Sequence, residues 1–196
     1  MRSSEERHTR CSWASEKEPL LVAYHDEEWG VVERDDEKLL AKLILDGAQA
    51  GLSWITILRK REGYLKAFHN FDPEKMAQFG KRDVERLMKD EGIVRNRMKI
   101  ESAIGNARAY LEMKGAGESF SEFIWQFTNG RTLQNRFHTW KEIPASTKES
   151  EALSKSLKSK GFTFVGPTTV YAFMQAIGMV NDHVIECFRH KELAKH

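Results

Sequence analysis

Helix-type spacing of apolar residues recurs along most of this chain, and most of these segments have a cap or a breaker at an end. Asp35 and Asp36, for example, can cap a helix that ends near Gly51. Strand-type alternation of Val, Ile, Thr and aromatic residues is rare. The pattern predicts an all-α fold of about eight to ten short helices. The expected helices cover 35–51, 53–68, a short segment from 72, 81–90, 96–114, 119–127, 146–161, 167–178 and 181–188.

Composition limits the class of protein. The chain has 196 residues, of which 40% are apolar and 31% charged, as in an ordinary globular protein. We expect one compact unit over 10–190, with flexible tails at 1–9 and 191–196. The longest apolar run, 170–180, is shorter than the ~20 residues of a membrane span, and the polar N-terminus does not resemble a secretory signal. These features predict a cytoplasmic protein with no membrane partner, and we expect a monomer.

Two segments do not fit the helical pattern. Residues 11–34 contain no clear helix but are rich in aromatic residues and histidine, among them Trp13, Tyr24, His25 and Trp29. A loop of this composition either covers the core or forms part of a site. Residues 128–143 are mixed and turn-rich, and we interpret them as an excursion from the helical body.

The charge balance neither demands nor excludes nucleic acid. Lys and Arg together number 31, against 29 Asp and Glu. Binding to nucleic acid depends on basic residues that gather on one face, and clusters occur at 59–61, 95–99 and 155–160. Any one such cluster is more often a solvated helix surface.

His183 and Cys187 have a spacing that suits metal ligands, because residues four apart share one face of a helix. Two further ligands would have to come from elsewhere, and the best candidates are Cys11 and His25 in the N-terminal segment. Four such ligands would form a closed tetrahedral site that joins the two ends of the chain, which is typical of structural zinc. The alternative is a buried histidine beside an inert thiol.

The segment 160–167 (KGFTFVGP) lies between two expected helices. Its glycines and the helix that begins at Pro167 would point backbone N–H groups outward, as phosphate binding requires. Two helices joined in this way can contact a DNA backbone without reading sequence. A plain helical hairpin is the alternative.

Asp46 interrupts an apolar helix face that also carries Leu39, Leu43 and Ala50. A buried carboxylate is unfavourable unless it is paired or hydrogen-bonded. Asp46 is therefore either satisfied locally or available to a cationic or N–H-bearing ligand. Trp54 and Tyr24 can supply flat walls for a planar ligand, although such residues are more often simply core.

Several motifs together resemble those of the bacterial 3-methyladenine DNA glycosylase I family, which belongs to the helix-hairpin-helix glycosylase superfamily. The resemblance covers roughly residues 10–188. The matching motifs are RCSW at 10–13, YHDEEWG at 24–30, QAGLSW at 49–54, NARAY at 106–110, FVG at 164–166, and NDH at 181–183 with Cys187.

The resemblance implies a DNA-repair enzyme that hydrolyses the N-glycosidic bond of 3-methyladenine in alkylated double-stranded DNA and releases the base. It implies a structural zinc ion held by Cys11, His25, His183 and Cys187. It also implies a helix-hairpin-helix element near 151–178, in which Val165 and Gly166 contact the DNA backbone. The residues that correspond to the family's damaged-base pocket are Tyr24, Asp46 and Trp54, with Asp46 as the catalytic carboxylate.

Two positions bear on how closely this chain follows the pattern. The family usually has glutamate where this chain has Asp46, which is shorter by one methylene group. Superfamily members that also cut the DNA backbone have a lysine just after the second hairpin glycine, where this chain has Pro167 and Thr168. No Schiff-base nucleophile is then available, so we expect a monofunctional enzyme. The superfamily's catalytic aspartate falls near Asp182, which we do not assign as the catalyst.

A mechanism follows from the chemistry of the damaged base. Methylation at N3 makes adenine a cation and a good leaving group, so no strong general acid is required. The base would be flipped out, stacked between Trp54 and Tyr24, and hydrogen-bonded to Asp46. Two other functions remain open: a non-catalytic zinc-containing DNA-binding module, and a zinc hydrolase with an open coordination position.

Overall fold

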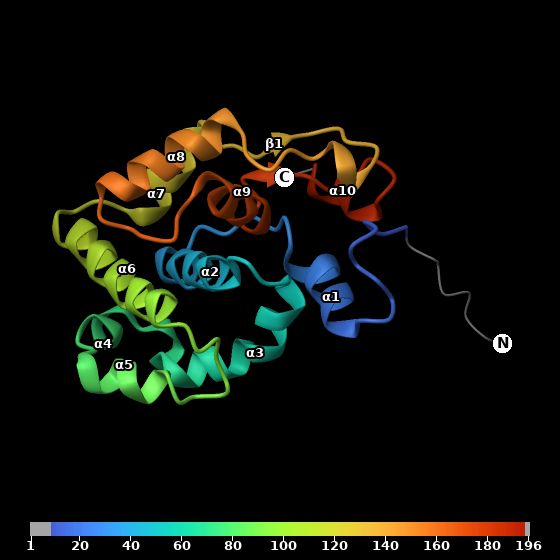
Figure 1. The fold of residues 1–196 in the computed structure, drawn as a ribbon. Coiled ribbons are helices and arrows are strands. Elements are labelled where there is room, and N and C mark those ends of the chain that lie inside the picture. The colour runs from blue at the N-terminus through green and yellow to red at the C-terminus, as the bar shows by residue number, and fades with distance from the viewer. Residues whose placement is uncertain (1–8, 195–196) are drawn as a thin grey trace.

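The structure is a computed structural model that describes residues 9–194. The all-α prediction is confirmed for this part of the chain (Figure 1). The α-helices are α1 (Pro19–Ala23), α2 (Asp36–Gln49), α3 (Trp54–Ala67), α4 (Pro73–Ala77), α5 (Lys81–Leu87), α6 (Arg97–Gly115), α7 (Phe120–Trp125), α8 (Lys148–Ser159), α9 (Pro167–Ala176) and α10 (Phe188–Leu193). Short π and 3-10 turns are η1 (Tyr24–Glu28), η2 (His69–Phe71), η3 (Gln126–Thr128) and η4 (Trp140–Glu142). Two parallel strands, β1 (Leu133–Gln134) and β2 (Val180–Asn181), pair with each other.

Local capping explains where several helices begin. The carboxylate of Asp35 accepts hydrogen bonds from the backbone N–H groups of Glu37 and Lys38, at 3.0 and 2.9 Å, and so starts α2 as predicted. Such caps satisfy donors that have no partner within the helix. Thr147 caps α8 through the N–H of Ser150, so this helix begins at Lys148, two residues after the predicted start at 146.

Helix α2 lies at the centre of the molecule (Figure 1). It packs against α6, α9 and α3, while α8 packs along α9 and α4 packs against α6. One large apolar cluster fills the space between these helices, and it includes the fully buried Leu39, Leu40 and Leu43 of α2. The predicted apolar stripe of this helix is therefore confirmed as core at Leu39 and Leu43, whereas Ala50 at its end is only partly buried.

A second, smaller cluster joins the two ends of the described chain, where α1 and α10 lie on the same side of the ribbon (Figure 1). Its buried members include Tyr24 and Trp29 from the N-terminal segment and Val184 from the C-terminal segment. Trp54, at the start of α3, packs against both clusters. Any site that includes Trp54 therefore lies where the two apolar clusters meet.

The prediction that residues 11–34 lack a helix is wrong. This segment forms α1 and then the π-type turn η1, in which the N–H of Trp29 donates to the carbonyl of Tyr24 at 2.8 Å. Proline at the first position of α1 favours the helix, but a five-residue helix has too little periodicity to be recognised in a sequence.

The predicted helix over 181–188 is also wrong. The chain enters β2, turns through 182–187 and begins α10 only at Phe188. Pairing with β1 decides this, because the N–H of Leu133 donates to Met179 and that of Asn135 donates to Asn181. The partner strand comes from the predicted excursion at 128–143, so the extended backbone depends on a contact distant in sequence.

The expected flexible tails, 1–9 and 191–196, lie partly outside the described residues. At the described ends, the N–H of Phe188 donates to the carbonyl of Thr9 at 3.1 Å, and α10 continues to Leu193. Among residues 9–194, no helix combines the length and apolar character needed to cross a membrane.

Candidate functional site

Four buried side chains meet where the N-terminal and C-terminal segments pack together. Their nitrogen and sulfur ligand atoms all lie within 4.8 Å of one another, and they belong to Cys11, His25, His183 and Cys187. The Sγ atom of Cys187 lies 3.4 Å from Nε2 of His25 and 3.4 Å from Nδ1 of His183, which is 3.6 Å from Sγ of Cys11. A tetrahedral ion with sulfur at about 2.3 Å and nitrogen at about 2.0 Å would hold a sulfur and a nitrogen ligand atom about 3.5 Å apart. The group can therefore hold a metal ion.

The other nitrogen of each histidine ring has a hydrogen-bond partner outside this group. Nδ1 of His25 lies 2.7 Å from a carboxylate oxygen of Asp26, and Nε2 of His183 lies 3.1 Å from the carbonyl oxygen of Trp29. Arg10 holds the Asp26 carboxylate at 2.7–2.9 Å. Such partners are typical of metal-binding histidines, because they fix the tautomer and the orientation of the ring.

Three acidic groups at this cluster, Asp26 and the two thiols, have perturbed pKa values. Burial alone would raise the pKa of Asp26, but hydrogen bonds from Arg10 and His25 outweigh it and lower that pKa. A hydrogen bond between the two thiols lowers the pKa of Cys187 and raises that of Cys11, so one thiolate forms more readily than two. A bound cation would favour the second thiolate as well.

The predicted ligand residues are brought together, but not in the predicted way. His183 and Cys187 lie in a turn, not on one face of a helix. The N–H of His183 donates to Oδ1 of Asn181 at 3.3 Å, and the N–H of Cys187 donates to Val184 at 2.8 Å. The four-residue spacing therefore suits a compact turn as well as a helix.

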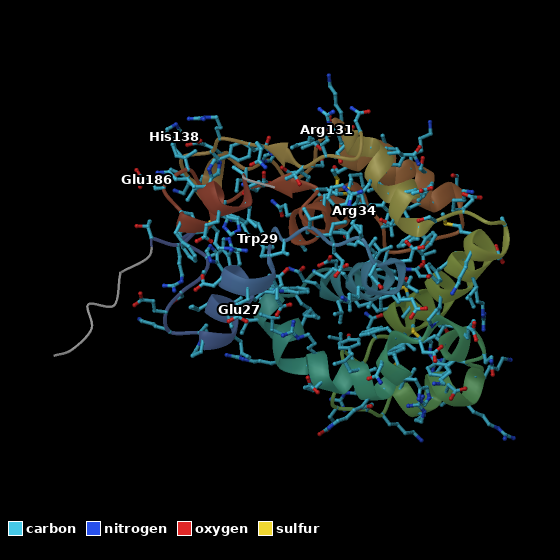
Figure 2. All side chains as sticks on the ribbon, turned by 180° about the vertical axis from the view of Figure 1, so that it is seen from behind. Glu27, Trp29, Arg34, Arg131, His138 and Glu186 are labelled. Carbon is cyan, nitrogen blue, oxygen red and sulfur yellow. The ribbon has the colours of Figure 1, made fainter. Side chains whose placement is uncertain are left out.

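A cavity of about 320 Å³ opens beside this cluster. Figure 2 labels one of its walls, Trp29, on the side of the molecule that carries His138 and Glu186. Aromatic side chains dominate the lining, with a few polar groups among them. The lining residues are Trp13, Leu21, Tyr24, Trp29, Asp46, Gln49, Ser53, Trp54, Ile55, Trp140, Ala172 and Gln175.

The three predicted pocket residues lie together in this cavity. The rings of Tyr24 and Trp54 are 5.2 Å apart between centroids and tilted by 46°. Tyr24 belongs to η1, directly before the metal-cluster residue His25, while Trp54 begins α3. Burial, with a smaller effect of the nearby Asp46, raises the pKa of Tyr24 well above its usual value, so its hydroxyl stays a neutral donor.

Asp46 contributes a buried carboxylate with one oxygen engaged and one without a partner. Only 4% of the residue is exposed, and Oδ1 accepts a hydrogen bond from Nζ of Lys42 at 2.6 Å. Burial raises the pKa of Asp46, against the opposing effect of Lys42. Oδ2 has no hydrogen-bond partner within the described residues, and the same is true of the indole nitrogens of Trp13 and Trp54. Buried polar atoms without partners are rare and point to a missing ligand or water.

Sequence reasoning did not assign several residues of this site. The sequence pattern places Trp13 and Trp29 only in an aromatic-rich loop, and Trp140 lies in the segment interpreted as an excursion. The ring centroid of Trp140 lies 6.0 Å from those of both Trp13 and Trp29. Lys42 had a signal that could have revealed it, since it precedes Asp46 by one helical turn.

The hairpin between α8 and α9 is held in place by hydrogen bonds from two side chains. The hydroxyl of Ser154 donates to the carbonyl of Val165 at 2.6 Å, and Asn106 exchanges two hydrogen bonds with the backbone of Thr163. Val165 is buried, and Gly166 is the residue before the first turn of α9. Any ligand contact at these two positions therefore has to use the backbone rather than side chains.

Asp182 lies within the core and has several partners. Its carboxylate accepts hydrogen bonds at 2.7 Å from Tyr171, Gln175 and Asn135. These bonds engage both of its oxygens, so the aspartate acts as an internal anchor between β2, α9 and the 128–143 segment.

Comparisons with known proteins identify the family of this chain. The family model described as methyladenine glycosylase matches residues 13–190. DNA-3-methyladenine glycosylase 1 of Escherichia coli is 56% identical over 178 residues, which are 91% of this chain and 95% of that protein.

Two solved structures extend the similarity to the fold. A crystal structure of 3-methyladenine DNA glycosylase I has a TM-score of 0.90 at 52% identity, and the match covers 92% of this chain and 98% of that one. A Staphylococcus aureus structure that describes 3-methyladenine recognition has a TM-score of 0.87 at 38% identity, covering 91% and 95%. The match of the family model over nearly the whole chain, together with these relatives, shows that this chain belongs to the methyladenine glycosylase family.

Proposed function

We propose that this protein is a DNA glycosylase that hydrolyses the N-glycosidic bond of 3-methyladenine in alkylated double-stranded DNA and releases the free base. The observation that carries the proposal is the carboxylate of Asp46, which lines an aromatic cavity and has one oxygen without a partner. The names of the relatives support the same activity.

The cavity suits a flat, cationic purine. Trp54 and Tyr24 offer ring faces for stacking and for cation–π attraction to the methylated base. Oδ2 of Asp46 would accept a hydrogen bond from the N–H edge of the base, and a charged acceptor makes this bond stronger than a neutral one. Asp46 would thus contact the reacting base directly.

Catalysis in this proposal depends on binding a good leaving group in the right place. The nucleotide is first flipped out of the duplex, which costs about a few kcal/mol of unstacking. The base carries its positive charge before the bond breaks, so a general acid is not needed. Water completes the hydrolysis at the sugar. Undamaged adenine lacks this charge and departs poorly, so part of the selectivity comes from the substrate itself.

The metal in this proposal is zinc, and its role is structural. Cys11, His25, His183 and Cys187 form a Cys2His2 set of the kind that prefers zinc, and four protein ligands leave no open position for water or substrate. A bound zinc ion would clamp the two ends of the chain together. A zinc hydrolase, the rival reading, requires a position that this set does not leave.

The hairpin between α8 and α9 is proposed as a helix-hairpin-helix element that holds the DNA backbone. Backbone N–H groups of Val165 and Gly166 lie at the N-terminal end of α9, where phosphate binding is favourable. Pro167 and Thr168 follow, so no lysine is available there for a Schiff base, and we expect no lyase activity.

Release of free 3-methyladenine from methylated duplex DNA tests the proposed function. We expect the wild-type protein to release the base and to leave the DNA backbone uncut. A protein that binds methylated DNA but releases no base would instead be the non-catalytic DNA-binding module. Single-stranded methylated DNA serves as the comparison substrate and tests the preference for duplex.

Location and assembly complete the proposal. Two buried cysteines that serve as metal ligands instead of a disulfide suit a reducing compartment, so we place the protein in the cytoplasm. A monomeric state remains a prediction, which sedimentation of the zinc-loaded protein would test.

A further inference from the structure

Lys42 has an unusual position for a lysine side chain. Only 18% of the side chain is exposed, and its ammonium lies 2.6 Å from Oδ1 of Asp46 and 4.0 Å from the ring centroid of Trp54. Both neighbours line the proposed base cavity, whereas Lys42 lines an adjoining cavity of about 280 Å³. Tyr24 lines both cavities. Lys42 thus contacts Asp46 and Trp54 but does not line the proposed base cavity itself.

The two carboxylate oxygens of Asp46 differ in their hydrogen bonding. Oδ1 is engaged by Lys42, and Oδ2 has no partner in the described part of the chain. A carboxylate as buried as this one would otherwise tend to take up a proton, because burial disfavours the charged form. A protonated Asp46 would lose the negative charge that a cationic base requires.

We propose that Lys42 is a positioning residue of the base pocket: its ammonium engages Oδ1 of Asp46, keeps the carboxylate ionised and leaves Oδ2 as the acceptor for the damaged base. This inference rests on the proposed function. It adds a specificity determinant outside the cavity lining, since Lys42 acts on the base only through Asp46.

Replacing Lys42 leaves the other charged groups around the Lys42–Asp46 pair in place. The uncharged Gln175 faces the cavity from α9. The titratable and charged groups that surround the pair from the neighbouring elements are Tyr24, Glu27 and Glu28 of η1, Glu33 of the following loop, Lys38 of α2, Arg61 of α3, and Lys99 of α6 at the C-terminal end of α2.

The test is the pH dependence of kcat/KM for release of 3-methyladenine from methylated duplex DNA, which reports the ionisation of groups in the free enzyme. Lys42→Met should move the acid limb upward by about 1 to 3 pH units, which is the effect of an adjacent cation on a carboxyl pKa. The activity should recover at higher pH, where Asp46 ionises without help. Lys42→Gln should also move the acid limb upward, but by less than Lys42→Met, because it keeps a donor to Oδ1 and loses only the charge.

Two controls separate this role from a structural one. Lys38→Met removes a lysine one turn earlier on α2, where the side chain is 71% exposed, and should leave the acid limb in place. The double variant Lys42→Met with Asp46→Asn should match Asp46→Asn alone to within about twofold, because both changes act through one interaction. Thermal melts of every variant identify any that fail to fold, and Lys42→Gln carries the test if Lys42→Met fails.

Three results would overturn the inference. One is an unshifted acid limb in a folded Lys42 variant. Another is a loss of activity that is equal at every pH. The third is a double variant far less active than Asp46→Asn. A wild-type protein that releases no base would be a distinct result, since it would overturn the proposed function itself and the inference with it.

Discussion

The metal-ligand cluster and the aromatic cavity lie next to each other, yet their polar atoms differ in one respect. In the cluster, both nitrogens of His25 and of His183 have a partner close at hand. In the cavity, Oδ2 of Asp46 and the indole nitrogens of two tryptophans, Trp13 and Trp54, have none within residues 9–194. Tyr24 and His25 are consecutive residues, and one lines the cavity while the other joins the cluster.

This difference suits the cluster to a structural role and the cavity to ligand binding. A buried polar atom without a partner costs about 1–3 kcal/mol, so a folded chain keeps such atoms mainly where a ligand will satisfy them. The cluster offers four side chains that could hold one ion, and the outer nitrogens of its histidines have partners within the protein. The cavity keeps three polar atoms that no described residue satisfies. Changes to the cluster should therefore affect stability, and changes to the cavity should affect base release.

The largest expected effect is a loss of stability in Cys187→Ala. Structural zinc sites in small zinc peptides contribute about 10–16 kcal/mol of apparent binding free energy, so removing a ligand should lower the free energy of unfolding by several kcal/mol. Each 1 kcal/mol corresponds to about 2–4 °C in a chain of this size, and the thermal midpoint should fall by roughly 10 °C or more. Circular dichroism melts and zinc analysis check this. A zinc-free variant that melts like the wild type would contradict the structural role.

Asp46→Asn should slow base release while changing stability little. A hydrogen bond to a charged group contributes about 1.5–3 kcal/mol, so release of 3-methyladenine should slow by roughly 10- to 150-fold. The amide oxygen can still accept from Lys42, so the zinc content should persist and the thermal midpoint should change less than in Cys187→Ala. Excision at the wild-type rate would show that Asp46 has no part in the reaction.

Trp54→Leu should have a smaller effect on the same site. Leucine keeps apolar contact with both clusters but removes the stacking face. Stacking of a base on an aromatic ring contributes about 1–3 kcal/mol, and at the lower end the affinity for free 3-methyladenine should fall roughly 5- to 20-fold. Calorimetric titration with the free base measures this. Unchanged affinity would mean that the base lies against other walls of the cavity.

Ser154→Ala should have the smallest effect, and on DNA rather than on the base. It removes the hydroxyl that fixes the Val165 carbonyl, a bond of about 1 kcal/mol, so affinity for duplex DNA should fall about fivefold. Affinity for free 3-methyladenine should not change, because Ser154 does not line the cavity. DNA binding measured over a salt series provides the comparison, and a parallel loss of base affinity would count against a separate hairpin role.

Much of the helical body was predictable because its signals are local. Asp35 caps α2 through its side chain as expected, and Asp72 caps α4 in the same way, at the position from which a short helix is predicted. The burial of Asp46 was also visible as a break in an apolar face. The short α1 and η1 are not predictable because a few residues carry too little periodicity. The helix predicted over 181–188 is absent because pairing with a partner strand overrides the local preference there.

The sequence by itself determined which side chains have the chemistry for a site, since the two cysteines, two histidines and one aspartate on an apolar helix face stand out by type and position. Only the tertiary structure decided that Trp140 lies against Trp13 and Trp29, that Lys42 engages one oxygen of Asp46, and that the other oxygen has no partner. The physical reason is that residue chemistry belongs to each position, whereas the satisfaction of a buried polar atom depends on segments that meet only when the chain has folded.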